Sequence, residues 1–259
     1  MSFARASASG KIASLRWDEV TALFGGTFDP PHIGHREAVR GLFSNPGVRR
    51  VLILPSPSPP HKPCFASFED RVKMVRLCFG STPADSFSYD VEVDLSEFER
   101  ARLNPGVPAY THETLQALRR NIPQLAFVVG ADQLQMLSTW YRFPSLLSLS
   151  HWIVLARRPN GISIALKTLQ EWEASGVCRR LGSAGLDGEW QLLKGAAFMK
   201  LVSTEAPDLS STLIREVIGR NGEPPVGALL PEVASYLKER RLYGSNAEAS
   251  GSSSKGEVK

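Results

Sequence analysis

The chain has 259 residues, of which 42% are hydrophobic, 22% charged and 8% aromatic. This composition supports a large core and argues against a disordered chain. The formal net charge is +4, and Arg5, Lys11 and Arg16 supply three of these charges before the first acidic residue, Asp18, so the remainder carries only +1. A broad nucleic-acid-binding face is therefore not expected.

In chain order, the sequence predicts a flexible N-terminal extension over residues 1–19, a single domain over residues 20–243 and a disordered tail over residues 244–259. Arg, Ser and Ala dominate the start of the extension, a composition typical of disorder and also of organellar transit peptides. The tail is rich in Ser and Gly and poor in apolar residues.

Between these ends, short apolar runs alternate with amphipathic stretches. The alternation predicts an α/β fold with a Rossmann-like, doubly wound parallel sheet and helices on both faces. Strands are expected at residues 21–25, 50–54, 88–93, 124–130, 151–156 and 198–202. Helices are expected at residues 34–43, 68–79, 111–120, 164–175, 211–219 and 231–242. Two further stretches are interpreted as a solvated charged segment, residues 97–102, and an irregular connection, residues 182–188.

Polar clusters follow several of the predicted strands. They are Gly25 to His35 after the first strand, Pro59 to Lys62 after the second, Gly130 to Asp132 after the fourth and Arg157-Arg158 after the fifth. A further cluster, Ser210 to Arg215, begins a late helix. Because ligands bind outside the carboxyl ends of strands in open α/β sheets, these clusters predict a site at one edge.

The segment Gly25 to His35 has the features of a turn that binds phosphate. Its glycines allow a ligand or a helix to approach the backbone closely. His32 and His35 are three residues apart, so both rings are expected on one side of the first helical turn. Such a pair suits an anion better than a metal, because no third Cys, His or carboxylate ligand is evident nearby.

The segment Ser210 to Arg215 has a helix-capping pattern followed by a cation. Hydroxyls and free N–H groups at a helix N-terminus favour an anion, and Arg215 lies one turn further along. Together with the first helix, this predicts a polyphosphate site. The chain has neither the Gly-x-x-x-x-Gly-Lys-Ser/Thr phosphate loop nor the Gly-x-Gly-x-x-Gly dinucleotide turn.

Membrane insertion and export are not expected, because no run approaches roughly 18 apolar residues and the N-terminus has no apolar signal core. Cys64, Cys78 and Cys178 are odd in number and widely spaced, which favours reduced thiols over disulfides or a zinc site. The expected compartment is the cytoplasm.

Gly25 to His35 resembles the signature of the HxGH nucleotidyltransferases, and Leu209 to Arg215 resembles that superfamily's second motif, Ile-Ser-Ser-Thr-x-Ile-Arg, with Leu in place of the first Ile. The chain is further similar, from about Ala22 to Tyr243, to the bacterial nicotinate mononucleotide adenylyltransferases. The additional matches are Pro59 to Lys62, Tyr110-Thr111 with Thr114-Leu115, Gly130-Ala131-Asp132 followed by Trp140, and Val154 to Arg157.

The resemblance implies transfer of the adenylyl group of ATP to nicotinate mononucleotide, giving deamido-NAD and pyrophosphate in NAD biosynthesis. A phosphate monoester carries its own nucleophilic oxygens, so alignment and charge stabilisation suffice without a protein nucleophile. Mg²⁺ is expected to be held mainly by the phosphates, with no metal-ligand cluster on the protein. The expected catalytic residues are His32, His35 and Arg215.

The same resemblance implies two substrate subsites. The ATP subsite comprises Gly25, Gly26, Thr27, Phe28, His32, His35, Arg157, Ser211, Thr212 and Arg215. The mononucleotide subsite comprises Lys62 near the phosphate, the Thr111 backbone near the pyridine carboxylate, Asp132 near hydroxyls, and Trp140 stacked on the ring.

Two alternatives stay open at this point. One is the same reaction on nicotinamide mononucleotide, which differs from nicotinate mononucleotide by one charge. The other is an ATP-binding sensor of the same fold that does not turn over its ligand. The sequence does not reveal the oligomeric state.

Overall fold

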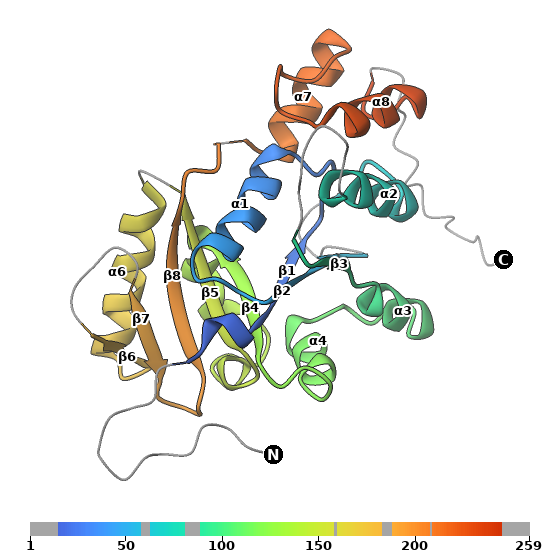
Figure 1. The fold of residues 1–259 in the computed structure, drawn as a ribbon. Coiled ribbons are helices and arrows are strands. Elements are labelled where there is room, and N and C mark those ends of the chain that lie inside the picture. The colour runs from blue at the N-terminus through green and yellow to red at the C-terminus, as the bar shows by residue number, and fades with distance from the viewer. Residues whose placement is uncertain are drawn as a thin grey trace, which may run out of the picture.

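Eight strands form one sheet in the order β3-β2-β1-β4-β5-β8-β7-β6 (Figure 1). The computed structural model describes residues 15–57, 63–80, 89–157, 160–182, 188–207 and 209–244. The strands are β1 (Thr21–Gly26), β2 (Arg50–Pro55), β3 (Val91–Val93), β4 (Leu125–Gly130), β5 (His151–Arg157), β6 (Cys178–Leu181), β7 (Glu189–Leu192) and β8 (Phe198–Thr204).

Helices connect the parallel strands and extend the fold at its C-terminal end. The α-helices are α1 (Ile33–Ser44), α2 (Phe68–Phe79), α3 (Ser96–Leu103), α4 (Thr111–Leu118), α5 (Ala131–Met136), α6 (Asn160–Ala174), α7 (Ser211–Asn221) and α8 (Pro231–Glu239). Short 3₁₀ helices are η1 (Trp17–Glu19), η2 (Leu137–Thr139) and η3 (Ser145–Ser148). Within the described residues, none of these helices has the length and apolar character needed to span a membrane.

The sheet separates two hydrophobic cores, because successive side chains of a strand point to opposite faces. In β5, Ile153 joins the core formed with α1, α2, α7 and α8, whereas its neighbours Trp152 and Val154 join the core formed with α4, α5 and α6. This alternation confirms the doubly wound α/β fold with helices on both faces.

The three cysteines are free thiols, with Cys78 and Cys178 buried and Cys64 exposed.

The chain reverses its direction of sheet growth between β1 and β4. β2 and β3 are added on one side of β1, whereas β4, β5 and β8 follow on the other, all in parallel register. The carboxyl ends of β1 and β4 therefore flank the topological switch point, where open α/β sheets bind ligands. Figure 1 shows α7 and α8 at the end of the molecule where α1 begins, with α8 beside α2.

The structure corrects the sequence prediction at the sheet edge. The antiparallel strands β6 and β7 extend the sheet beyond β8, so the sheet is mixed rather than wholly parallel. The expected irregular connection lies between them, and its residues 183–187 are outside the described part of the chain.

Two other segments differ from expectation. Residues 97–102 form most of α3 rather than a solvated stretch, and Glu97 is buried and accepts a 2.9 Å hydrogen bond from the Thr114 hydroxyl. At the N-terminus, Trp17 is buried and its indole N–H donates to Glu189 at 3.2 Å. Packed structure therefore begins before residue 20, where the sequence placed the domain boundary.

Candidate active site

The turn between β1 and α1, residues 27–32 and hereafter the β1–α1 turn, is held in a strained conformation. Phe28 has φ 51°, a value that non-glycine residues rarely adopt, and its ring is buried. A Cβ atom on Gly26 would lie 2.9 Å from Cζ of Phe28, so only glycine leaves room for this ring. The Phe28 ring then packs edge-on against His35, with 5.1 Å between ring centroids.

His32 and His35 come together as the sequence predicted. Their ring centroids are 3.8 Å apart. A Cβ atom on Gly34 would lie 3.0 Å from Nδ1 of His32 and 3.3 Å from the Pro207 carbonyl oxygen, so glycine allows this close packing. Within the described residues, Nδ1 of His32 is buried without a hydrogen-bond partner, as expected of a group that meets a ligand.

Both histidines are neutral near pH 7. Burial, helped by the Arg157 charge, lowers the pKa of His32 to about 4. Burial, then His32 and Arg157, lowers the pKa of His35 well below its ordinary value. Nδ1 of His35 accepts the His32 backbone N–H at 3.2 Å, which assigns the proton of the neutral His35 ring to Nε2. His35 is therefore a hydrogen-bond donor that needs no positive charge.

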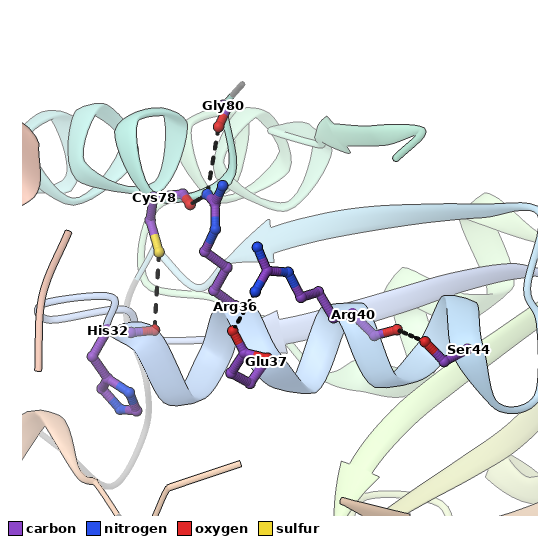
Figure 2. A network of polar contacts seen from close by, with 7 residues as sticks. All are labelled: His32, Arg36, Glu37, Arg40, Ser44, Cys78 and Gly80. Carbon is purple, nitrogen blue, oxygen red and sulfur yellow. Dashed lines mark hydrogen bonds and ion pairs between the residues drawn. The ribbon is translucent and has the colours of Figure 1, made fainter. Parts of the chain in front are cut away.

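The start of α1 is fastened on two sides. The Ile33 N–H donates to the Ala228 carbonyl at 2.9 Å, which ties it to the connection between α7 and α8. The buried Arg36 donates to the carbonyls of Cys78 and Gly80 at the C-terminal end of α2 (Figure 2). Figure 2 also shows the His32 ring directed away from α2, while the His32 carbonyl faces the Cys78 thiol. These contacts fix the helix that carries both histidines.

The N-terminus of α7 meets the β1–α1 turn. Ser210 caps the helix by accepting the Leu213 N–H at 3.1 Å. The Ser211 hydroxyl donates to the Pro30 carbonyl at 2.8 Å, and Arg215 Nη1 donates to the Asp29 carbonyl at 2.6 Å. The structure thus brings the two predicted halves of the site together, although they are far apart in sequence.

Arg215 is held in a defined orientation. Its Nη2 lies 3.3 Å from the Thr212 hydroxyl, and its guanidinium lies over the Phe65 ring at 4.4 Å from the centroid. Arg215 is half-buried. A planar guanidinium fixed by one carbonyl and one aromatic face can still present N–H groups to a phosphate.

Arg157 and Asp132 also lie at the carboxyl ends of their strands. Arg157 is exposed at the end of β5, and its Nη1 donates to the Leu209 carbonyl at 3.3 Å, just before α7. The positive charge of Arg157 also helps to lower the pKa values of both histidines. Asp132 is exposed in the first turn of α5, where a Cβ atom on Gly130 would lie 2.5 Å from its Oδ1.

Two more of the residues expected to bind the mononucleotide lie on α4 and after α5. Thr111 is the first residue of α4, so its N–H has no partner within the helix. Trp140 is half-buried and packs edge-on against Phe127 at a centroid separation of 6.2 Å. Lys62 lies outside the described residues, so its role stays a prediction.

The described part of the chain contains no group of three His, Cys, Asp or Glu side chains that could hold a metal ion. The carboxylate in the β1–α1 turn, Asp29, is 1% exposed and accepts the Phe65 N–H at 2.8 Å, the Ala66 N–H at 3.2 Å and the Tyr243 hydroxyl at 2.5 Å. With three donors already around it, Asp29 is not arranged as a metal ligand.

Three residues that the sequence analysis did not single out hold the site in place. They are Asp29, Arg71 and Tyr243. Arg71 is buried and its guanidinium donates to the carbonyls of Thr27 at 2.8 Å, Ser56 at 2.7 Å and Pro57 at 3.1 Å. The sequence offered a signal for Arg71, because it is a charged residue on the apolar face of an amphipathic helix. It offered none for Tyr243, because nothing near Tyr243 in the sequence indicates its partner.

Comparison with known proteins gives concordant results. Residues 23–217 match the model of the cytidylyltransferase-like family. A protein of Serratia proteamaculans (strain 568) is 40% identical over 228 residues, covering 86% of this chain and 94% of its own length. A protein of Yersinia pestis (strain Pestoides F) is 36% identical over 226 residues with the same coverage. Both carry the name "Probable nicotinate-nucleotide adenylyltransferase".

A solved structure shares the fold. Plasmodium falciparum nicotinic acid mononucleotide adenylyltransferase complexed with NaAD superposes with a TM-score of 0.60 at 16% identity, covering 86% of this chain and 96% of that one.

Proposed function

Since the chain belongs to the cytidylyltransferase-like family and, within it, to the nicotinate-nucleotide adenylyltransferases, we propose that it transfers the adenylyl group of ATP to nicotinate mononucleotide through the site between β1 and α7. The products are deamido-NAD and pyrophosphate. The observation that carries this assignment of residues is that the N-terminus of α7 meets the β1–α1 turn, through Ser211 and Arg215, next to the helix that carries the paired histidines.

The chemistry requires alignment more than proton transfer. An oxygen of the mononucleotide phosphate attacks the α-phosphorus of ATP, a P–O bond forms, and the bond to the pyrophosphate breaks. The attacking oxygen is already anionic near neutral pH, so no general base is needed. The protein has to hold both substrates in line and stabilise the charge that accumulates on the transferring and leaving phosphates.

His35 and His32 are assigned to the ATP phosphates as neutral hydrogen-bond donors. The His35 tautomer offers Nε2–H, and Nδ1 of His32 has no hydrogen-bond partner among the described residues. Arg215, on α7, supplies the formal positive charge. A donor that is neutral in the free protein costs less to bury than an imidazolium.

Selection of nicotinate over nicotinamide is assigned to the start of α4. The Thr111 N–H is unused by its helix, and Tyr110, which precedes it, makes no side-chain capping bond. A helix N-terminus favours an anionic carboxylate over a neutral amide. Trp140 is assigned to the pyridine ring, Asp132 to ribose hydroxyls and Lys62 to the mononucleotide phosphate.

A divalent ion, Mg²⁺ in our proposal, enters as part of the ATP substrate. The absence of a three-ligand cluster among the described residues and the three donors already on Asp29 fit an ion held by phosphate oxygens. When bound, it offsets charge on the phosphates. We expect EDTA to abolish turnover and added Mg²⁺ to restore it, measured as pyrophosphate release.

A product assay tests the proposal. Pyrophosphate release is followed with ATP and either nicotinate or nicotinamide mononucleotide, under otherwise identical conditions. We expect kcat/KM to be about 100-fold higher for nicotinate mononucleotide, because the anion-binding donors are left unpaired by an amide. A reversed preference would assign the chain to nicotinamide mononucleotide, and an equal preference would overturn the assigned selection for nicotinate. ATP binding without pyrophosphate release would indicate a sensor.

A further inference from the structure

The last described turn of the chain reaches into the β1–α1 turn. The Tyr243 hydroxyl donates to Oδ1 of Asp29 at 2.5 Å, a contact between residues 214 positions apart. Tyr243 is 7% exposed, and burial together with the Asp29 charge raises the pKa of its phenol, which therefore stays protonated and donates. This hydrogen bond is shielded from water on both sides.

Asp29 transmits that contact to Arg215 by two routes. Its own carbonyl accepts Arg215 Nη1 at 2.6 Å. Its Oδ2 accepts the N–H of Phe65, whose ring lies beneath the Arg215 guanidinium at 4.4 Å. Two of the groups that orient the arginine are thus set by the position of one buried carboxylate.

The backbone of Tyr243 supports a specific role for this contact. Tyr243 has φ 64°, in the left-handed region that disfavours side chains larger than glycine. Such a conformation persists only where the surroundings impose it, and it recurs at functional sites. If the Tyr243 ring served only to fill space, its hydroxyl would not need to donate a hydrogen bond to the buried Asp29 carboxylate.

We propose that Tyr243 is a positioning residue for catalysis, which orients Arg215 through Asp29 so that the guanidinium faces the reacting phosphates. The C-terminal end of the domain is then part of the catalytic apparatus, although it touches no substrate. This inference rests on the proposed function.

The chain offers a matched control for removing one tyrosine hydroxyl. Tyr236 on α8 donates to Oδ1 of Asp70 at 2.7 Å, which is the same chemistry in the same C-terminal region. Neither Tyr236 nor Asp70 contacts the β1–α1 turn through a described hydrogen bond. Both Tyr243→Phe and Tyr236→Phe preserve ring volume, so each is expected to fold and to lower the thermal midpoint by a few degrees.

Steady-state kinetics separate the two variants. We expect Y243F to lower kcat about tenfold with KM for ATP within about twofold. A guanidinium that is displaced but still present loses more of its interaction with the transition state than with the ground state. Y236F should leave kcat unchanged. Equal kcat in Y243F and the unsubstituted chain overturns the inference, whereas no pyrophosphate release from the unsubstituted chain overturns the proposed function itself.

A double-mutant cycle identifies the route. In an Arg215→Lys background, the effect of Y243F on kcat should shrink from about tenfold to about twofold or less, because the group that Tyr243 orients is already altered. An undiminished effect would show that Tyr243 acts independently of Arg215 and would overturn the inference. On the free protein, amide exchange of Phe65 and Ala66 should accelerate in Y243F and not in Y236F; unchanged exchange would overturn the link through Asp29.

Discussion

Phe28 and Gly26 show how closely side-chain size is restricted around the β1–α1 turn. The Phe28 ring lies where a Cβ atom on residue 26 would approach it to 2.9 Å, and the same ring supports His35. The glycine that the sequence analysis interpreted as making room for a ligand therefore makes room for a side chain of the chain itself. Its role in ATP binding stays a prediction.

Gly26→Ala should destabilise the fold, whereas Gly25→Ala serves as the matched control. A Cβ atom on Gly25 meets only Phe127, at 3.6 Å, which is ordinary contact. We expect G26A to lower the free energy of unfolding by about 1–3 kcal/mol through overpacking, and G25A to change it by much less. Denaturant unfolding of the free proteins measures both; equal losses would contradict the steric argument.

His35→Ala tests whether the histidine pair serves turnover. Loss of one preorganised donor should lower kcat by about 100-fold, while ATP affinity, measured by calorimetry, should fall less than about fivefold. Glu37→Gln on the same helix is the control, because Glu37 pairs with Arg40 away from the site. Loss of ATP binding without a separate loss of kcat would favour the sensor hypothesis.

At the scale of elements, α2 joins the ends of β1 and β2. Arg71 reaches from its first turns to the Thr27 carbonyl after β1 and to the Ser56 and Pro57 carbonyls after β2. The guanidinium thus joins the β1–α1 turn to the segment that leads toward Lys62. One buried fork links the segments expected to hold the two substrates.

Arg71→Lys keeps the charge but not the fork. A lysine ammonium cannot reach three carbonyls in this planar arrangement, so buried acceptors are left unpaired. We expect the free energy of unfolding to fall by about 2–4 kcal/mol and KM for the mononucleotide to rise. Arg76→Lys, at an exposed position of the same helix, should change neither quantity. Similar effects in both variants would show that α2 is sensitive to substitution in general, and would contradict a specific role for the Arg71 guanidinium.

Elements with strong periodicity could be predicted from sequence, and short or highly charged ones could not. α2 begins and ends where its pattern predicts, at Phe68 and Phe79. By contrast, β6 and β7 have four residues each, too few for alternation to stand out, and β6 carries two arginines. Half of the residues of α3 are charged, and the helix is stabilised by tertiary contacts, such as the stacking of Phe98 on Phe68 with 4.1 Å between ring centroids.

The same distinction applies to the site. The motif residues His32, His35 and Arg215 could be identified from local spacing. The structure pairs the two histidines and joins Arg215 to the β1–α1 turn. Tyr243 could not, because its partner Asp29 lies 214 positions away and a lone tyrosine near the end of a chain carries no pattern. Residues expected to face ligands are therefore easier to find from sequence than the residues that hold them in position.

For the whole molecule, buried histidines predict loss of stability in mild acid. Burial lowers the pKa of His32 and of His151 to about 4, and that of His35 also lies well below its ordinary value. Each binds its proton more weakly when folded than when unfolded, so stability is full above about pH 6.5 and falls as pH drops toward 4. The slope should reach about 1.4 kcal/mol per pH unit for each histidine.

Denaturant unfolding at constant ionic strength between pH 7 and 4.5 measures this dependence. Nδ1 of His151 accepts the Phe198 N–H, and Nε2 donates to Oε1 of Gln124. His151 lies at the opposite end of β5 from the site. His151→Gln should therefore reduce the pH slope without changing kcat at pH 7.5. A free energy of unfolding that is flat over this range would contradict the burial argument.

The contact between Asp29 and Tyr243 also bears on when the protein becomes active during its synthesis. Residues 23–217 match the family model, yet a ribosome that has made only these residues has not supplied the hydroxyl that completes the Asp29 carboxylate. Contacts of such long sequence separation form late in folding. Under the role inferred for Tyr243, a nascent or prematurely terminated chain can contain every motif residue and still lack a correctly oriented Arg215, so catalytic competence is expected only after residue 243 has been made.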